Sequence, residues 1–368
     1  MESLKILIYN WRCWLNPEAG GAEVFTREVV KRWVEGGHEV TLFCSGFVGC
    51  RGEEVLDGVR VVRAGGKFGV YWKAKEFYRK RFSKEGFDVV VDEVNTRPFF
   101  APRFVCGGER VVGLVHQLAR EFWFYETRFP VSYVGYYFLE DWWLRGYVGV
   151  PMVTVSESTR RDLLGLGFRR VFVVSEGLNF EPLRVVPEKS VVPVVVFVGR
   201  LKRAKRPDDA VRAFGRVREE FPSAELWVVG DGYFRGVLER LAGEGVRFFG
   251  GLSDVERREL VRRSWVLVNP SVREGWGLNV LEANGLGVPC VGYDVAGLRD
   301  SICDGVTGVL VRSGDVEGLG GALVGVLGDE EFRMRLSKNA LEYARGFSWD
   351  RTAEEFMRVI RGVMNDEG

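Results

Sequence analysis

Two glutamates stand eight residues apart within the stretch Arg273–Pro289, with glycines at positions 275 and 277 between Glu274 and Glu282. On one continuous helix of 3.6 residues per turn, the two carboxylates would lie about 80° apart around the axis. Glycine costs roughly 1 kcal/mol in a helix interior, so one continuous helix is not expected. We therefore place Glu274 in a loop and Glu282 about two turns into the following helix. Two such carboxylates suit the hydroxyls of a polyhydroxylated ligand, or the acid and nucleophile of a hydrolase.

A second candidate site is the basic loop that follows Gly199. Gly199 ends a strand-like run and is followed by Arg200-Leu201-Lys202-Arg203-Ala204-Lys205-Arg206. Arg200 and Lys205 can neutralise charge that develops on a leaving diphosphate, as a metal ion does in other enzymes. The alternative is an ordinary solvated basic loop. The sequence has no Asp-x-Asp pair, so it predicts no carboxylate-bound Mg²⁺.

A glycine pair and a histidine are the candidates in the first half of the chain. Gly20 and Gly21 precede a helical segment, where free N–H groups favour a negative group and glycine allows close approach. His116 ends the strand-like run Val111–Val115. The alternatives are an ordinary glycine loop and a hydrogen-bonded histidine at a strand end. The other histidine, His38, is predicted to be structural.

The segment Val229–Gly236 imitates a dinucleotide-binding fingerprint without matching it. Its glycine spacing is G-x-G-x-x-x-G, and the next predicted strand ends without an acidic residue that could bind a ribose. We interpret Gly230-Asp231-Gly232 as a tight turn, and NAD binding is not predicted.

These residues sit on a regular alternation of short apolar runs and helix-length amphipathic segments, which is typical of βαβ units. The pattern predicts two doubly wound, Rossmann-like domains facing each other across a cleft, where the carboxyl ends of parallel strands bind ligands. The first domain spans 1–183 and the second spans 193–345, and the helix 348–364 is expected to pack back on the first. The predicted strands are 6–9, 40–43, 59–63, 89–91, 111–115, 152–155 and 171–174, then 194–198, 226–229, 247–249, 265–268, 290–293 and 308–311.

Bulk composition limits the class of protein. A length of 368 residues fits two domains, and a net charge of +1 argues against a nucleic-acid partner. Six cysteines without a C-x-x-C pair favour reduced thiols over disulfides or a zinc site. The first residues lack the apolar region of a signal peptide, and no run of 18 apolar residues occurs, so a cytoplasmic protein is expected.

The order of these motifs resembles the family 4 (group 1) retaining glycosyltransferases of GT-B fold. The resemblance covers nearly the whole chain and is strongest from Val196 to Val311. It implies that Glu274 accepts hydrogen bonds from the transferred sugar, that Glu282 binds the nucleotide ribose, and that His116 lies against the sugar. It also implies diphosphate contacts from Arg200 and Lys205. The donor-binding residues that it implies are Gly20, Gly21, Gly199, Gly275, Trp276, Gly277, Leu278, Asn279 and Glu282.

Two positions depart from the family's pattern. Trp276 stands where phenylalanine is frequent, a change that a binding site tolerates. Gln117 follows His116 where aspartate is common, which puts a second polar contact to the sugar in doubt.

The resemblance implies a retaining, metal-independent hexosyltransferase without a cofactor. Its donor would be a nucleotide diphosphate sugar, with a GDP- or UDP-sugar favoured, and its acceptor a hydroxyl of a glycan or lipid-linked glycan. The leaving phosphate would help to deprotonate the acceptor, so no protein nucleophile is expected. The alternatives are a GT-B epimerase or phosphorylase, or a non-catalytic subunit that binds a nucleotide sugar.

Two further segments each have two interpretations. The aromatic-rich segment 121–147 belongs to the core or forms an acceptor site, where rings stack on a sugar. In the segment 70–84, Tyr71, Ala74, Tyr78 and Phe82 form an apolar stripe flanked by basic residues. That stripe either docks on an anionic membrane at the inner face of the cell membrane or packs against the sheet.

Overall fold

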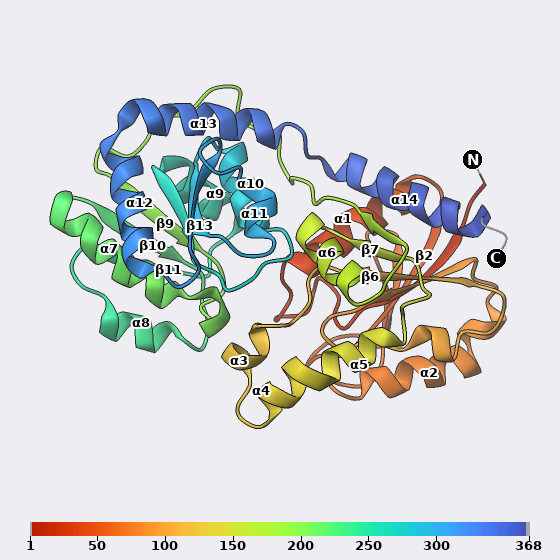
Figure 1. Cartoon of the computed structure of the whole chain (residues 1–368). Coiled ribbons are helices and arrows are strands. Elements are labelled where there is room, and N and C mark those ends of the chain that lie inside the picture. Colours follow the sequence, from red (N-terminus) through yellow and green to blue (C-terminus); the bar gives the residue numbers. More distant parts are fainter. Residues whose placement is uncertain (1, 366–368) are drawn as a thin grey trace. The chain divides into compact units, whose positions relative to one another are not determined.

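The computed structural model describes residues 2–365 and divides into two α/β units (Figure 1). Among the described residues, the first unit comprises 2–119, Val134–Gly177 and 348–365. The second comprises Arg120–Tyr133 and Leu178–Phe347. The sequence analysis had assigned Arg120–Tyr133 to the first domain, and the contacts of this segment are described with the site below.

The first unit is built on an eight-stranded sheet of order β3-β4-β2-β1-β5-β6-β7-β8. Every pairing is parallel except that between β3 and β4. Its strands are β1 (Lys5–Tyr9), β2 (Glu39–Cys44), β3 (Glu53–Leu56), β4 (Val59–Arg63), β5 (Val89–Glu93), β6 (Arg110–Val115), β7 (Met152–Thr154) and β8 (Val171–Val173).

The second unit is built on a six-stranded parallel sheet of order β11-β10-β9-β12-β13-β14. Its strands are β9 (Val194–Val198), β10 (Glu225–Val229), β11 (Val246–Gly250), β12 (Val266–Asn269), β13 (Cys290–Tyr293) and β14 (Gly308–Val311). The central strand β9 reads Val-Val-Val-Phe-Val and is buried at all five positions. Helices cover both faces of such a sheet, so its strands become continuous apolar runs.

Helices connect these strands. The first unit contains α1 (Gly21–Glu35), α2 (Val70–Lys80), α5 (Glu140–Arg145), α6 (Glu157–Gly165) and α14 (Trp349–Asn365), and a π-helical turn (Gly135–Leu139) leads into α5. Helix α4 (Val131–Val134) falls where the chain passes from the second unit to the first. The second unit contains α3 (Phe122–Glu126), α7 (Pro207–Glu220), α8 (Arg235–Leu241), α9 (Asp254–Arg263), α10 (Leu278–Gly285), α11 (Leu298–Ser301), α12 (Val316–Gly328) and α13 (Glu330–Ala344).

The last helix, α14, packs in the first unit beside α1 (Figure 1). The Trp33 indole N–H donates to the Ala353 carbonyl at 3.0 Å. The Ser348 hydroxyl accepts from the backbone N–H of Arg351 at 3.2 Å and caps the start of the helix. Gly177 lies so close to this helix start that an added Cβ would stand 2.3 Å from the Trp349 nitrogen. Glycine is therefore required where the two backbones meet.

Helix α2 corrects the basis of the membrane prediction. Its stripe residues Tyr71, Ala74 and Tyr78 are buried, as is Phe82 just beyond the helix, and all four belong to the core of the first unit. The prediction that this stripe faces lipid is wrong, because the sheet already covers it. The basic residues around it remain on the surface. Within residues 2–365, no helix has both the length and the apolar character needed to cross a membrane.

Candidate active site

The loop after β9 is held against the loop after β10 by close backbone packing. The Gly199 N–H donates to the Val229 carbonyl at 3.0 Å, and the Leu201 N–H donates to the Asp231 carbonyl at 2.9 Å. A Cβ on Gly230 would stand 2.0 Å from the Gly199 oxygen. Gly230 therefore allows the two loops to pack closely, and this packing fixes the path of the basic loop that begins at Gly199.

Lys205 and Glu274 form a tight ion pair in this loop region. The Lys205 ammonium lies 2.6 Å from each carboxylate oxygen of Glu274. The Ser271 hydroxyl donates to the same carboxylate at 2.8 Å. Only 22% of the Lys205 side chain and 12% of the Glu274 side chain are exposed, so the pair is weakly screened by solvent. Lys205, predicted to contact a diphosphate, thus contacts the residue that was predicted to bind the sugar.

The loop that carries Glu274 is shaped by two glycines. The backbone N–H of Glu274 donates to the Ala296 carbonyl at 3.0 Å. A Cβ on Gly297 would lie 2.2 Å from the backbone carbonyl oxygen of Glu274, so only glycine allows this close approach of the two backbones. Gly277 has φ of 103°, a left-handed conformation that suits glycine, and α10 begins directly after it.

The position of α10 confirms one expectation about the two glutamates and corrects another. Glu274 lies in a loop and Glu282 in the helix, as predicted. Because the helix begins at Leu278, Glu282 lies about one turn from its start rather than two. Its carboxylate accepts from the Arg257 guanidinium at 3.0 Å.

The N-terminus of α10 presents a run of backbone donors. Within residues 2–365, the N–H groups of 275–279 donate to no other backbone or side-chain group. Unpaired N–H groups at a helix start form an anion-binding site. The Asn279 side chain donates to the Val198 carbonyl at 2.9 Å, and this bond ties the helix start to the end of β9.

Trp276 contributes packing rather than a ring face for a ligand. Its side chain is only 6% exposed and its ring centre lies 5.5 Å from that of Phe347. Only its backbone can therefore line the predicted donor site. Gly275, Leu278 and Asn279 beside it are partly exposed.

Helix α3 supplies contacts that the sequence analysis missed. The Glu126 carboxylate accepts from the Ala204 N–H at 3.0 Å and from the Tyr233 hydroxyl at 3.1 Å. The Arg206 guanidinium donates to the Tyr125 hydroxyl at 3.1 Å. Glu121, just before the helix, accepts from Arg273 at 2.8 Å.

These contacts give α3 a defined place in the site. It packs on the 3₁₀ turn Arg203–Lys205 and also holds the residue before Glu274. The sequence signal for these contacts is the pair Glu121 and Glu126, which flank the aromatic residues 122–125 and are opposite in charge to the basic loop 200–206. The segment 121–147 is partly core, and its role as an acceptor site stays a prediction. Trp123 and Leu144 are buried, whereas Phe138 and Trp142 are 69% and 59% exposed.

In the first unit, His116 lies at the carboxyl end of β6. Its side chain is almost buried, and its ring centre lies 5.0 Å from that of Phe25 on α1 in an edge-to-face arrangement. Its Nδ1 lies 3.7 Å from a Glu176 carboxylate oxygen. Neither ring nitrogen has a hydrogen-bond partner in the described part of the chain, so both are available to a ligand that reaches them.

The two glycines at the start of α1, Gly20 and Gly21, have different roles in the structure. The Gly20 N–H donates to the Glu23 carboxylate at 2.6 Å, and Glu23 lies 3.2 Å from the Arg12 guanidinium. Gly20 has φ of −148°, an extended conformation open to any residue. Its N–H is thus engaged within the protein, and Gly21 is the first residue of the helix.

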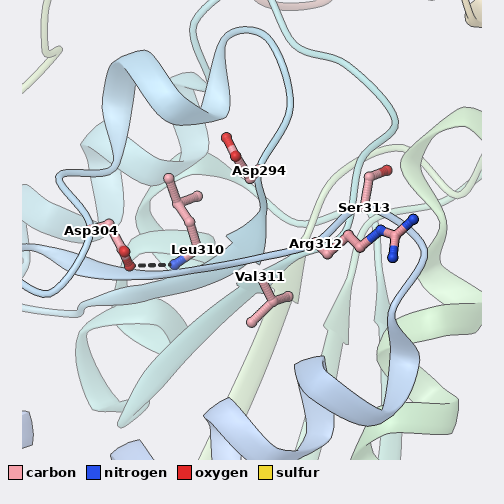
Figure 2. A pocket seen from close by; sticks show the side chains of 6 residues that line it. All are labelled: Asp294, Asp304, Leu310, Val311, Arg312 and Ser313. Atoms are coloured by element: carbon pink, nitrogen blue, oxygen red, sulfur yellow. Dashed lines mark hydrogen bonds between the residues drawn. The ribbon is translucent and has the colours of Figure 1, made fainter.

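A surface hollow of about 570 Å³ lies on the second unit at the ends of β13 and β14 (Figure 2). Asp294, Asp304 and Arg312 are among its walls, and Asp304 accepts from the Leu310 N–H at 2.9 Å. None of the predicted donor-binding residues lines it. Across residues 2–365, no group of three or more His, Cys, Asp or Glu side chains is arranged to hold a metal ion.

Solved structures identify the fold. Sucrose-phosphate synthase from Thermosynechococcus elongatus matches with a TM-score of 0.80 and 20% identity over 98% of both chains. WaaG, a glycosyltransferase involved in lipopolysaccharide biosynthesis, matches with a TM-score of 0.77 and 18% identity over 97% of this chain and all of WaaG. HepE from Anabaena, solved with UDP and glucose, matches with a TM-score of 0.72 and 15% identity over 98% of this chain and all of HepE. The protein therefore has the GT-B fold of two parallel-sheet α/β domains.

Family models assign the chain more narrowly. The model of group 1 glycosyl transferases matches residues 181–343, and that of glycosyltransferase family 4 matches residues 19–181. The chain belongs to the family 4, group 1 glycosyltransferases, as the resemblance predicted.

Individual relatives agree with this assignment over part of their length. D-inositol 3-phosphate glycosyltransferase of Nocardiopsis dassonvillei is 30% identical over 208 residues, which are 51% of this chain and 47% of the relative. Glycogen synthase of Mycobacterium tuberculosis is 29% identical over 239 residues, 61% of this chain and 57% of the relative. The matches thus span about half the length of these relatives.

Proposed function

We propose that the protein transfers a hexose, with retention of anomeric configuration and without a metal ion, from a nucleotide diphosphate sugar to a hydroxyl of a glycan or lipid-linked glycan. The observation that carries this proposal is the run of unpaired N–H groups at 275–279, directly beside the fixed carboxylate of Glu274. A diphosphate needs such donors, and a sugar hydroxyl needs such an acceptor. The solved complex of HepE with UDP and glucose supports a nucleotide-sugar donor, with a UDP- or GDP-sugar favoured.

The predicted charged residues have separate roles in this proposal. Glu274 binds hydroxyls of the transferred sugar, and Glu282, oriented by Arg257, binds the ribose. Lys205 shares its ammonium between Glu274 and the diphosphate, and Arg200 supplies a second positive charge. These fixed charges stabilise the leaving nucleoside diphosphate, the role that a metal ion has in other enzymes.

The remaining steps need no protein nucleophile. In the first unit, the family resemblance assigns His116 to sugar binding and Gly21, the first residue of α1, to donor binding. The leaving phosphate accepts the proton of the attacking hydroxyl on the face from which it departs, and this geometry retains the anomeric configuration. A covalent intermediate on Glu274 is not part of the proposal, because both of its oxygens already accept hydrogen bonds from Lys205.

Thermal denaturation with UDP, GDP, ADP, CMP and dTDP sugars tests the donor assignment. A ligand at 100 times its Kd adds about 2.7 kcal/mol to the free energy of unfolding, so one nucleotide should raise Tm clearly above the others. Donor hydrolysis in the presence of EDTA then separates an enzyme from a non-catalytic binding subunit. Absence of any Tm shift across the nucleotides would refute the proposal. A visible absorbance band from a lysine-bound pyridoxal phosphate would instead indicate a phosphorylase.

The location proposed for the protein is the cytoplasm, with peripheral docking on an anionic membrane surface through segment 70–84. Because the apolar stripe of this segment is buried, the docking now rests on exposed cations such as Lys75 and Lys84. Each basic residue near an anionic surface contributes roughly 1 kcal/mol, so several of them can recruit the protein reversibly.

A further inference from the structure

A basic, aromatic-lined surface lies at the carboxyl end of the first sheet and has no role in the site described above. It is formed by the loops after β1, β4 and β5 together with the first turn of α2. We call it the Arg97 surface, and its residues are Trp11, Arg12, Lys67, Tyr71, Trp72 and Arg97. Ligands of α/β sheets bind at this end of the strands.

Arg97 is a cation without a carboxylate partner. Its guanidinium carbon lies 4.5 Å from the ring centre of Tyr71 and 5.3 Å from that of Trp72. Its Nε is buried and has no hydrogen-bond partner, and no carboxylate among residues 2–365 forms an ion pair with it. A half-buried charge is costly when its donors are unused, so a partner is expected from outside the chain.

The backbone fixes Arg97 in this position. Thr96 and Phe100 both adopt left-handed conformations, with φ of 67° and 62°, although neither is glycine. The buried carboxylate of Asp92 accepts from the N–H groups of Phe99 and Ala101, at 3.2 and 3.0 Å. Non-glycine residues persist in such conformations where their surroundings hold them, and they cluster at ligand sites. The loop therefore presents Arg97 already in place.

Two further cations share this surface. The Arg12 guanidinium lies 4.4 Å from the Trp11 ring centre, and the Lys67 ammonium lies 5.6 Å from the same ring. Burial raises the pKa of Tyr71 to about 12, and the charges of Arg97 and Arg12 act in the opposite direction. Both guanidinium groups thus act on one ring. Arg12 is paired with Glu23 and Lys67 with Glu18, which leaves Arg97 as the cation most available to an anion.

We propose that the Arg97 surface binds an anionic group of the acceptor, either a phosphate or a carboxylate. Arg97 is its principal ligand, because its fork of donors matches the oxygens of both groups. The exposed face of Trp72 contacts the sugar ring that carries the anion. This inference rests on the proposed function, because it assumes that the first sheet receives the acceptor.

Titration of the full chain with small anions tests the inference. The protein is saturated with the nucleoside diphosphate that stabilises it, so that the donor site is blocked. Inorganic phosphate, glucose 6-phosphate, glucuronate and uncharged glucose are then added, and the indole N–H resonances of Trp11 and Trp72 are followed by NMR. We expect both indoles to shift with the anions and not with glucose. A preference for glucose 6-phosphate or for glucuronate identifies the acceptor's anion as phosphate or carboxylate.

Variants give the test its controls. Arg97→Ala should weaken binding of the preferred anion by about 10- to 150-fold, the loss of one charge-assisted contact, and Arg97→Lys should restore part of it. Arg358→Ala removes an exposed arginine from α14 and should have no effect. Nucleotide binding by Arg97→Ala should match the wild type, which shows that the variant is folded.

The outcomes separate this inference from the proposed function. Anion binding that is unchanged in Arg97→Ala, or indole shifts that glucose reproduces, would overturn the inference while leaving the donor assignment intact. Failure of the wild-type protein to bind any nucleoside diphosphate would instead remove the proposed function on which the inference rests.

Discussion

The Glu274 carboxylate is held by hydrogen bonds from Lys205 and Ser271 before any ligand arrives. If the proposed function holds, a sugar hydroxyl meets an acceptor whose direction is already set, and little reorganisation is needed on binding. Lys205 orients Glu274, and in the proposed function the same ammonium also supplies charge to the diphosphate.

Removal of this lysine should therefore damage turnover. Lys205→Ala and Arg200→Ala should each lose about 1.5–3 kcal/mol, or 10- to 150-fold in kcat/KM. Ser271→Ala is the milder control, since it removes one neutral donor to the same carboxylate, about 1 kcal/mol. Activity should persist in EDTA. Wild-type rates in Lys205→Ala, or loss of activity on chelation with recovery on adding Mn²⁺, would contradict this assignment.

The two glutamates should differ in calorimetry with the bare nucleoside diphosphate. Glu282→Ala should weaken its binding, because the ribose loses an acceptor that Arg257 orients. Glu274→Gln should reduce kcat with the full donor and leave nucleotide binding nearly unchanged. The roles are wrongly assigned if the nucleotide is lost by Glu274→Gln and kept by Glu282→Ala.

Asp92 gives the folded chain a pH dependence with a definite sign. Burial raises its pKa from 3.8 to about 6, against hydrogen bonds from Tyr147 and two backbone N–H groups. The folded state binds this proton more tightly than the unfolded state does. Its stabilisation is therefore complete below the unfolded pKa and is lost as the pH rises through about 6, a change on the order of 3 kcal/mol.

The variant Asp92→Asn should not lose stability through this titration as the pH rises. Urea unfolding of both proteins at pH 4, 5, 6 and 7 measures it, and the wild type should lose stability relative to the variant over that interval. Parallel curves for the two proteins would show that Asp92 titrates alike in the folded and unfolded states.

At the scale of elements, the parallel strands could be predicted and α3 could not. Strands such as β9 are buried on both faces, so their valine-rich runs identify them without any tertiary information. The edge strand β3 was missed, because Glu53-Glu54 break the apolar pattern, as charges at sheet edges do. The role of α3 depends on the bond from Ala204 to Glu126, 78 positions apart, and no local pattern encodes such a contact.

The contacts of α3 predict a positioning effect. Glu126→Ala leaves the Ala204 N–H and the Tyr233 hydroxyl without their acceptor and should loosen the 3₁₀ turn that carries Lys205. Each lost bond is worth about 0.5–1.5 kcal/mol, so KM for the donor should rise about 2- to 10-fold while Tm changes little. Glu219→Ala, an exposed acid on α7, is the matched control. An unchanged KM in Glu126→Ala would show that α3 does not position the turn.

At the scale of the whole molecule, charge governs the predicted membrane docking. Sedimentation with anionic liposomes should remove the protein from solution at low salt and release it at high salt, and neutral liposomes should not bind it. Lys75→Glu with Lys84→Glu should abolish the effect, whereas Lys338→Glu on α13 should not. Salt-independent binding would point instead to insertion of exposed aromatic residues such as Phe138 and Trp142.

The close approach of Gly177 to the start of α14 means that Leu178–Phe347 is inserted into the first unit at a single point of its surface. The backbone leaves the first unit after Gly177 and returns at Ser348, and a Cβ on Gly177 would stand 2.6 Å from the Ser348 carbonyl carbon. Gly177 and Ser348 are therefore neighbours in space, so Leu178–Phe347 can be deleted and the two residues joined by a linker of a few residues. The first unit would keep every strand of its sheet and α14, and only Arg120–Tyr133 of the second unit would remain, because that segment leaves and re-enters the first unit separately.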